Sequence, residues 1–338
     1  MSILLSHNSS LERLRAVPPQ VDQATLLSEP LALDGIACQN DLFSESELRS
    51  FGLLQRPVHQ LVPSRRHASP GDAARLHRCT CDVIPQGLVK KVENRVFCAG
   101  PELTFVQMAG ETSFLGAVVL GHELCGSYAH FSQMVSGFYE RPPLTSVERL
   151  RHAVSQLEGM RGVGAARKAL RFVRNRSASS METVVSCMLL LPTAMGGFGM
   201  VAPELNYKVT LDESEARVAG AKAPRIDTGY PAVLVGIEFD GLDYHRDVEH
   251  DARRREALSH KGWTIYVLNV DELTNYSKLK EKVSLLDAVP RRPGEGFPTD
   301  SDGRALLKRL LTATRCGVGI NDALFGVKVP KGLVKLHV

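Results

Sequence analysis

The chain lacks the long apolar segment that a membrane-spanning helix requires, about 20 residues. Its most apolar helix-like stretch, Phe114 to Leu124, is interrupted by His122 and Glu123. That stretch is also too short to cross a bilayer. We therefore expect no membrane partner for this protein.

Cysteine is scarce and irregularly spaced, which argues against a disulfide framework. The seven cysteines are an odd number, and one residue separates Cys79 from Cys81, where a zinc knuckle has two. The first twenty residues mix Arg, Glu and Pro, so they do not resemble a signal peptide. These absences predict reduced thiols and a cytoplasmic location.

The chain also has little excess charge of either sign. A formal net charge of +4 over 338 residues permits nucleic acid as a partner but does not demand it. The ordinary hydrophobic content, 43%, is typical of a globular protein. The length is sufficient for two domains, each with its own core.

Composition divides the chain into three segments. Residues 1–175 predict a small α+β domain that begins with a loose arm or helical cap of about 35 residues and ends in a basic helix near 165–174. A polar linker from Asn175 to Ser180 then leads into a domain at 176–289. Residues 290–338 read as a breaker-rich linker, a short helix and a basic tail.

The segment 176–289 alternates helical and strand-like patterns. We expect a helix at 181–191, strands at about 205–210, 223–227 and 233–240, a helix at 247–260, a strand at 263–268 and a helix at 271–286. Helices and strands in this order predict an α/β arrangement around one sheet.

Two acids end the apolar strand that starts at Val233. Glu238 and Asp240 stand two residues apart, so their side chains point to the same face of the strand. Asp227 ends the preceding strand-like segment, and a short turn can bring it close to Glu238. Carboxylates that meet in this way repel each other unless a cation lies between them, and Mg²⁺ prefers such oxygen ligands. The pattern predicts a metal site that acts on phosphoryl groups. The alternative interpretation is that one or more of these acids is an exposed residue in a surface turn.

Other residues around this cluster have both a functional and an ordinary interpretation. Glu182 could reach the metal from its helix, or only close a capping box with Ser179. His245 could accept a proton from an attacking water, or simply pack in a loop. Arg254 could contact a phosphate, or pair with an acid on the helix surface or in the cluster.

The motif as a whole resembles a known family. The residues that carry the likeness are Arg225-Ile226-Asp227, Ile237-Glu238-Phe239-Asp240-Gly241, His245, Asp251-x-x-Arg254-x-x-x-Leu258 and Gly262-Trp263. Residues 177–275 are thereby similar to the very-short-patch-repair-like (Vsr-like) endonuclease domain, a branch of the PD-(D/E)XK nuclease superfamily. The resemblance implies a restriction-endonuclease-like three-layer α/β/α core and Mg²⁺- (or Mn²⁺-) dependent hydrolysis of phosphodiesters, most often in DNA.

The resemblance also implies roles for individual residues. Asp227 and Glu238 would bind the metal, Glu182 would match the helix acid of such domains, and Asp240 would occupy the position that most of the superfamily gives to Lys. The zinc ligands of true mismatch-repair members have no counterpart, since the region holds only Cys187. A mismatch-specific activity is therefore not implied, while a role in host defence or in a mobile element is compatible with the likeness.

The front half offers a second hypothesis. Its segments at 58–62, 82–85 and 100–109 resemble the C-terminal part of type IV abortive-infection antitoxins, with Leu103 and Gln107 where that family has Arg and Asp. Together with the missing Lys, this likeness predicts the alternative function, a nucleic-acid-binding regulator that does not cut. RNA is a further possible ligand.

A basic stretch precedes the nuclease-like segment. Arg167, Arg171 and Arg174 repeat at helical spacing, and no acid lies between residues 161 and 176. Such a face could contact phosphates or simply be solvated. We expect nucleic acid, DNA first, as the partner; the sequence does not specify an oligomeric state.

Overall fold

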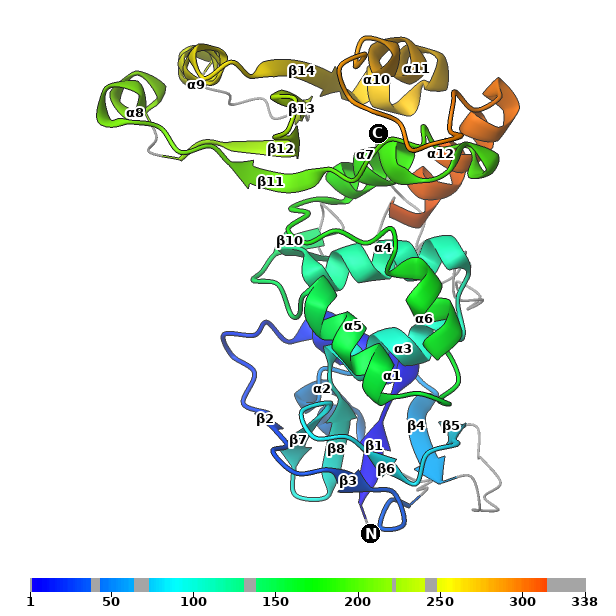
Figure 1. Ribbon diagram of the computed structural model, residues 1–338. Coiled ribbons are helices and arrows are strands. Elements are labelled where there is room, and N and C mark those ends of the chain that lie inside the picture. The colour runs from blue at the N-terminus through cyan, green and yellow to red at the C-terminus, as the bar shows by residue number, and fades with distance from the viewer. Residues whose placement is uncertain are drawn as a thin grey trace. The chain divides into compact units, whose positions relative to one another are not determined.

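The computed structural model describes residues 2–37, 43–63, 73–130, 138–220, 223–240 and 248–314, which form a mixed α/β protein (Figure 1). The chain divides into two compact units. Among the described residues, unit 1 takes those up to Cys125 together with Ala129–Val173, and unit 2 takes Gly126–Tyr128 and those from Arg174 onward. None of the helices in the described ranges combines the length and apolar character that crossing a bilayer requires.

Unit 1 is built on a six-stranded sheet with the order β2-β7-β8-β1-β4-β5. The strands of this sheet are β1 (Ile3–Leu5), β2 (Thr25–Leu26), β4 (Val58–Pro63), β5 (Ala74–Cys79), β7 (Val89–Glu93) and β8 (Val96–Ala99). Short pairs are formed by β3 (Leu31–Ala32) with β6 (Val83–Ile84), and by β9 (Tyr128–His130) with β10 (Phe138–Glu140). The helices of the unit are α1 (His7–Ala16), α2 (Glu45–Ser50), α3 (Pro101–Ala109), α4 (Phe114–Cys125), α5 (Val147–Gln156) and α6 (Val163–Ala169).

The sequence analysis allowed a loose arm or a helical cap at the start of the chain; the structure has the helix α1 there, but a strand, β1, precedes it. β1 lies inside the sheet, where it pairs parallel with β8 and antiparallel with β4. Its residues Ile3 and Leu5 are buried in one apolar cluster with residues of α2, β4 and β8. The sequence analysis missed this strand because β1 is only three residues long and the segment that follows residue 17 is rich in Pro and Ser. The apolar side chains of β1 are buried on both faces of the sheet.

The helices α1 and α3 pack together, with α1 against β4 and α3 against β8. The predicted helix at 165–174 is wrong in its extent, because α6 ends at Ala169 and a turn follows. Arg171 and Arg174 consequently do not continue the helical face of Arg167.

Unit 2 holds a four-stranded sheet with the order β11-β12-β13-β14 (Figure 1). Its elements are α7 (Ser180–Leu190), the 3-10 turn η1 (Thr193–Met195), β11 (Glu204–Lys208), α8 (Glu213–Ala219), β12 (Arg225–Tyr230), β13 (Val235–Asp240), α9 (Val248–His260), β14 (Thr264–Asn269), α10 (Val270–Thr274), α11 (Tyr276–Ser284) and α12 (Asp300–Thr314). The expected order of helix, three strands, helix and strand is present. The structure adds α8, which the sequence analysis did not anticipate, and divides the predicted helix at 271–286 into α10 and α11.

The sheet of unit 2 changes direction at β13. β11, β12 and β13 are antiparallel neighbours, while β13 and β14 run parallel, from Val235↔Thr264 to Asp240↔Asn269. A parallel neighbour needs a crossover, and α9 supplies it. Gly262 ends this crossover with a φ of +82°, a conformation that favours glycine, and brings Trp263 back to donate its N–H to Leu258.

Apolar packing fixes the crossover on the sheet. Ile226 of β12, Ala257 and Leu258 of α9 and the adjoining Trp263 belong to one buried cluster. α7 contacts β12, and α12 contacts α7. The acidic residues singled out in the sequence therefore lie on strands that apolar contacts hold in place.

Candidate functional site

Asp227 lies where β12 and β13 stop pairing in the regular way. The register runs from Tyr230↔Val235 to Thr228↔Ile237. Beyond it, the Asp227 carboxylate accepts the backbone N–H of Phe239 at 2.9 Å. This side chain therefore lies against β13, next to Glu238.

Glu238 is buried, with one oxygen engaged and one not. Its Oε2 accepts a hydrogen bond from Arg254 of α9 at 2.7 Å. Its Oε1 is buried and has no hydrogen-bond partner among the described residues. Burial raises the pKa of Glu238, Arg254 opposes the increase, and the negative charge of Asp227 adds to it. The unsatisfied oxygen and the raised pKa both indicate a site that a cation would relieve.

Glu182 reaches the same cluster from the first turn of α7. Ser179 caps that helix by accepting the N–H of Glu182, while the Glu182 carboxylate accepts hydrogen bonds from the Ala178 N–H and from the Asn206 amide of β11, at 2.8 and 2.7 Å. Burial, followed by the charge of Asp227, raises the pKa of Glu182 to about 7. Capping explains the position of Glu182, but it does not explain why its carboxylate is buried within reach of Asp227.

The remaining predicted residues of this cluster are Asp240, His245 and Arg254. Asp240 is half-buried at the end of β13, opposite Asn269 of β14. His245 lies outside the described residues, so its expected role stays a prediction. Arg254 also donates to the carbonyl of Arg225 at 2.8 Å, which ties α9 to the start of β12.

The three basic candidates are distributed over both units. Arg167 pairs with Glu158 at 2.6 Å, and both side chains are more than half exposed. Arg167 and Arg171 line a pocket of about 340 Å³ in unit 1 together with Arg151 of α5. Arg174 belongs to unit 2, where its positive charge lies close enough to lower the pKa of Tyr230 against the effect of burial.

A second constellation lies in unit 1, and the sequence analysis did not find it. His7, His77 and Glu111 each offer a metal-ligand atom, and these atoms lie within 4.8 Å of one another. Among the described residues, this is the group of three potential ligands whose atoms all lie within 4.8 Å of one another. The carboxylates of unit 2 do not form such a group. His7 belongs to α1, His77 to β5 and Glu111 to the turn after α3. His77 lies 70 residues after His7, and Glu111 lies 34 residues after His77, so no short-range motif in the sequence indicates that the three residues meet.

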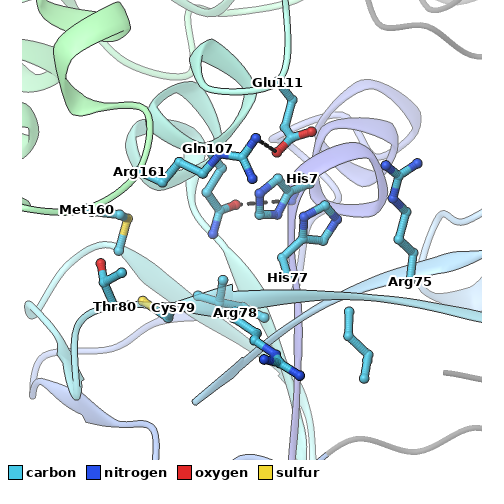
Figure 2. A pocket seen from close by; sticks show the side chains of 12 residues that line it. His7, Arg75, His77, Arg78, Cys79, Thr80, Gln107, Glu111, Met160 and Arg161 are labelled. Atoms are coloured by element: carbon cyan, nitrogen blue, oxygen red, sulfur yellow. Dashed lines mark hydrogen bonds and ion pairs between the residues drawn. The ribbon is translucent and has the colours of Figure 1, made fainter. Parts of the chain in front are cut away.

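The three residues line a pocket of about 450 Å³, drawn in Figure 2. His7 stacks on His77 with ring centroids 3.4 Å apart, and His77 shares a hydrogen bond of 2.9 Å with His59. Burial lowers the pKa of His7 to about 2, of His77 to about 3 and of His59 to about 4, with a further decrease from neighbouring positive charges, Arg75 among them. All three imidazoles are therefore neutral at pH 7.

Comparison with known proteins adds no assignment to either site. No protein-family model matches the chain, and neither a curated protein nor a solved structure matches it. The two constellations must therefore be interpreted from their own geometry.

Proposed function

We propose that unit 2 is a metal-dependent endonuclease that hydrolyses phosphodiester bonds, with DNA as the first substrate to test. The observation that carries this proposal is a pair of buried carboxylates, Glu182 and Glu238, on either side of the half-buried Asp227, whose negative charge adds to the effect of burial in raising the pKa of both. A protein that buries acids beside each other without a matching number of cations loses stability, so such clusters are typical of functional sites. The order of elements from α7 to β14 supports a restriction-endonuclease-like core.

The donor atoms fit a hard divalent cation. Asp227 and Glu238 offer carboxylate oxygens, and the Oε1 atom of Glu238 is buried without a partner. Mg²⁺ or Mn²⁺ bound there would activate water and stabilise negative charge on the phosphoryl group. Asp227 and Glu238 would hold the ion, with Asp240 and Glu182 at its margin.

The protein's own residues divide the other tasks. Arg254 forms an ion pair with Glu238. If Glu238 binds the metal instead, the guanidinium of Arg254 is free to donate two hydrogen bonds to a phosphate of the substrate. Glu182, with a pKa of about 7, can hold or release a proton at neutral pH. Arg253 and Arg255 flank Arg254 on α9 and add the positive charge that an acidic site needs to approach a polyanion.

The test is a cleavage assay on single-stranded, duplex and branched DNA and RNA, with and without Mg²⁺ or Mn²⁺. We expect metal-dependent cutting that falls at least ~100-fold in Glu238→Gln and in Asp227→Asn, as expected for lost metal ligands. Glu204→Gln is the matched control, because Glu204 is an exposed carboxylate on the neighbouring strand β11. The proposal fails if no substrate is cut with either ion, or if Glu238→Gln cuts as well as the wild type.

A regulator that binds nucleic acid without cutting is the second candidate function. Two observations favour it: Arg254 already neutralises Glu238, and the superfamily lysine is replaced by Asp240. Binding that persists without metal, with no cleavage product and no effect of Glu238→Gln, would support this alternative. Competition between DNA and RNA would then identify its ligand.

A further inference from the structure

The histidine cluster of unit 1 is built around His7, which holds an unusual backbone conformation. His7 is the first residue of α1 and has a φ of +49°, in the left-handed region that non-glycine residues rarely adopt. Its N–H donates to Oε1 of Gln107 at 3.0 Å, and its ring is buried. A strained residue that is held in place by α3 and buried in a pocket lining is typical of a functional position.

The second histidine is placed by the sheet. Arg75 of β5 is the register partner of His59 of β4. His77 lies two residues after Arg75 on β5, so the side chains of Arg75 and His77 point to the same face of the sheet. The backbone of His59 is bonded to the start of α1, because the Ser6 N–H donates to its carbonyl and its own N–H donates to Ser9, both at 2.9 Å. Strand and helix are thus fixed to each other where the two rings meet.

Each of the three candidate ligands has a further partner that would orient it. Nδ1 of His7 bonds to the Ser6 hydroxyl at 3.0 Å, and Nε2 of His77 bonds to His59. Oε1 of Glu111 pairs with Arg161 at 3.2 Å, as Figure 2 shows. Within the described part of the chain, each of the three side chains keeps a second nitrogen or oxygen that could bind a ligand. Metal-binding imidazoles and carboxylates in proteins are held by outer hydrogen bonds of this kind.

We propose that His7, His77 and Glu111 bind a divalent transition-metal ion of the Zn²⁺ type, with an open position toward the pocket. Two imidazoles and one carboxylate are a recurrent ligand set for zinc that keeps one position for water or substrate. Tetrahedral ligands at about 2.0–2.1 Å from an ion lie roughly 3.4 Å apart, so atoms within 4.8 Å need only small side-chain movements. The rings must also splay from their interplanar angle of 12°, because stacked rings direct their lone pairs side by side.

The pocket lining is consistent with this assignment. Arg75 and Arg78 line the same pocket from β5, so the molecule that approaches the open position would carry negative charge. The buried Nε2 of Gln107 has no hydrogen-bond partner in the described part of the chain and is a further donor at the pocket lining.

The experiment is titration of the metal-free full chain with Co²⁺, read by its visible absorption, and with Zn²⁺, read by calorimetry. We expect a saturable site with the intense bands of four-coordinate Co²⁺, displaced by Zn²⁺; an ion held by the unit 2 carboxylates would absorb only weakly. His77→Gln and Glu111→Gln should weaken binding at least ~10-fold. His7→Asn serves as a third variant because Asn tolerates the left-handed backbone.

Two controls separate this site from its surroundings and from unit 2. His152→Ala removes an exposed histidine of α5 and should leave the titration unchanged. Asp227→Asn with Glu238→Gln removes the proposed nuclease ligands and should also leave the Co²⁺ bands intact, so the two proposals stand or fall separately. Circular dichroism of each variant checks that the chain remains folded.

The outcomes that overturn the proposal are equally specific. Absence of a saturable Co²⁺ or Zn²⁺ site would refute it, and so would binding that folded His77→Gln and Glu111→Gln variants retain. A site that binds inorganic phosphate in the presence of a chelator, but no metal, would reassign the pocket to an anion held by Arg75 and Arg78.

Discussion

Two buried carboxylates, Glu123 in unit 1 and Glu182 in unit 2, have pKa values shifted in opposite directions. Glu123 receives two hydrogen bonds from Arg15, at 2.8 and 2.6 Å, and one from the His130 N–H at 3.1 Å. Despite complete burial, these interactions lower its pKa to about 2. For Glu182, burial and then the charge of Asp227 raise the pKa to about 7, against the hydrogen bond from Asn206. Burial alone therefore does not decide the final pKa of an acid; the charge of the group beside it does.

The largest expected effect on stability follows from breaking the buried ion pair between Arg15 and Glu123 in unit 1. Glu123→Gln leaves the buried Arg15 without its counter-charge and should lower the free energy of unfolding by about 3–5 kcal/mol. Urea denaturation followed by circular dichroism measures this. Replacing both partners, Arg15→Met with Glu123→Leu, should cost less, since the Arg15 charge is removed together with its counter-charge; the buried Arg141, which also interacts with Glu123, accounts for the remaining cost. If the single and double variants are equally unstable, the charge pair is not the cause.

The second effect is a pH dependence to which Glu182 contributes most in unit 2. The pKa of Glu182 in the folded chain, about 7, lies above its ordinary 4.5, so the folded state binds the extra proton between these values. Stability of unit 2 should therefore fall as pH rises from 4.5 to 7, by about 1–3 kcal/mol for this group, and Glu182→Gln should reduce the fall to the part that the raised pKa of Glu238 contributes. The single tryptophan, Trp263, is buried in unit 2 and reports its unfolding by fluorescence. A wild-type curve as flat as that of the variant would contradict the raised pKa.

The third effect concerns Arg254, the cation that partly relieves the unit 2 acids. Arg254→Gln should raise the pKa of Glu238 further and destabilise unit 2 by about 1–2 kcal/mol, less than in unit 1 because the Arg254 side chain is 21% exposed. Added Mg²⁺ should restore more stability to this variant than to the wild type, since the freed carboxylate binds it. Equal Mg²⁺ effects would show that Glu238 does not bind the ion.

The smallest effect is expected at an exposed pair. Arg167 and Glu158 are 56% and 70% exposed, so Arg167→Ala should change stability by less than about 1 kcal/mol. If Arg167 contacts phosphates, the same change weakens nucleic-acid binding uniformly across sequences and lowers its salt dependence. Filter binding at several salt concentrations measures both; an unchanged salt slope would leave Arg167 as a solvated residue.

Sequence alone predicted much of unit 2 and little of the site in unit 1. The acids of unit 2 occur on consecutive elements, Asp227 on β12 and Glu238 on β13, so a strand period and a short turn are enough to bring them together. The partners Asn206 and Arg254 depend on side-chain geometry that no spacing shows, although Arg254 was named as able to pair with an acid. His7, His77 and Glu111 meet only through the order of strands in a six-stranded sheet and through its packing against α1 and α3. A single sequence contains no periodicity that reveals such long-range neighbours.

The helix at 165–174 was predicted too long for a related reason. Helical spacing of arginines continues past Ala169, but the apolar residues Leu170, Phe172 and Val173 are buried next to one another in sequence, and the chain turns there to bury them. The burial of apolar side chains, and not the helical spacing of the arginines, therefore determines where the helix ends.

The position of β1 has a consequence for how the protein is made. Ile3, Leu4 and Leu5 leave the ribosome before their neighbours on both sides, because β4 and β8 are complete only when Pro63 and Ala99 have been added. Until then a fully apolar strand has unpaired edges, which invites association with other chains. Unit 1 should therefore fold slowly and depend on chaperones during synthesis, whereas the neighbouring strands β11, β12 and β13 of unit 2 can pair almost as soon as they emerge.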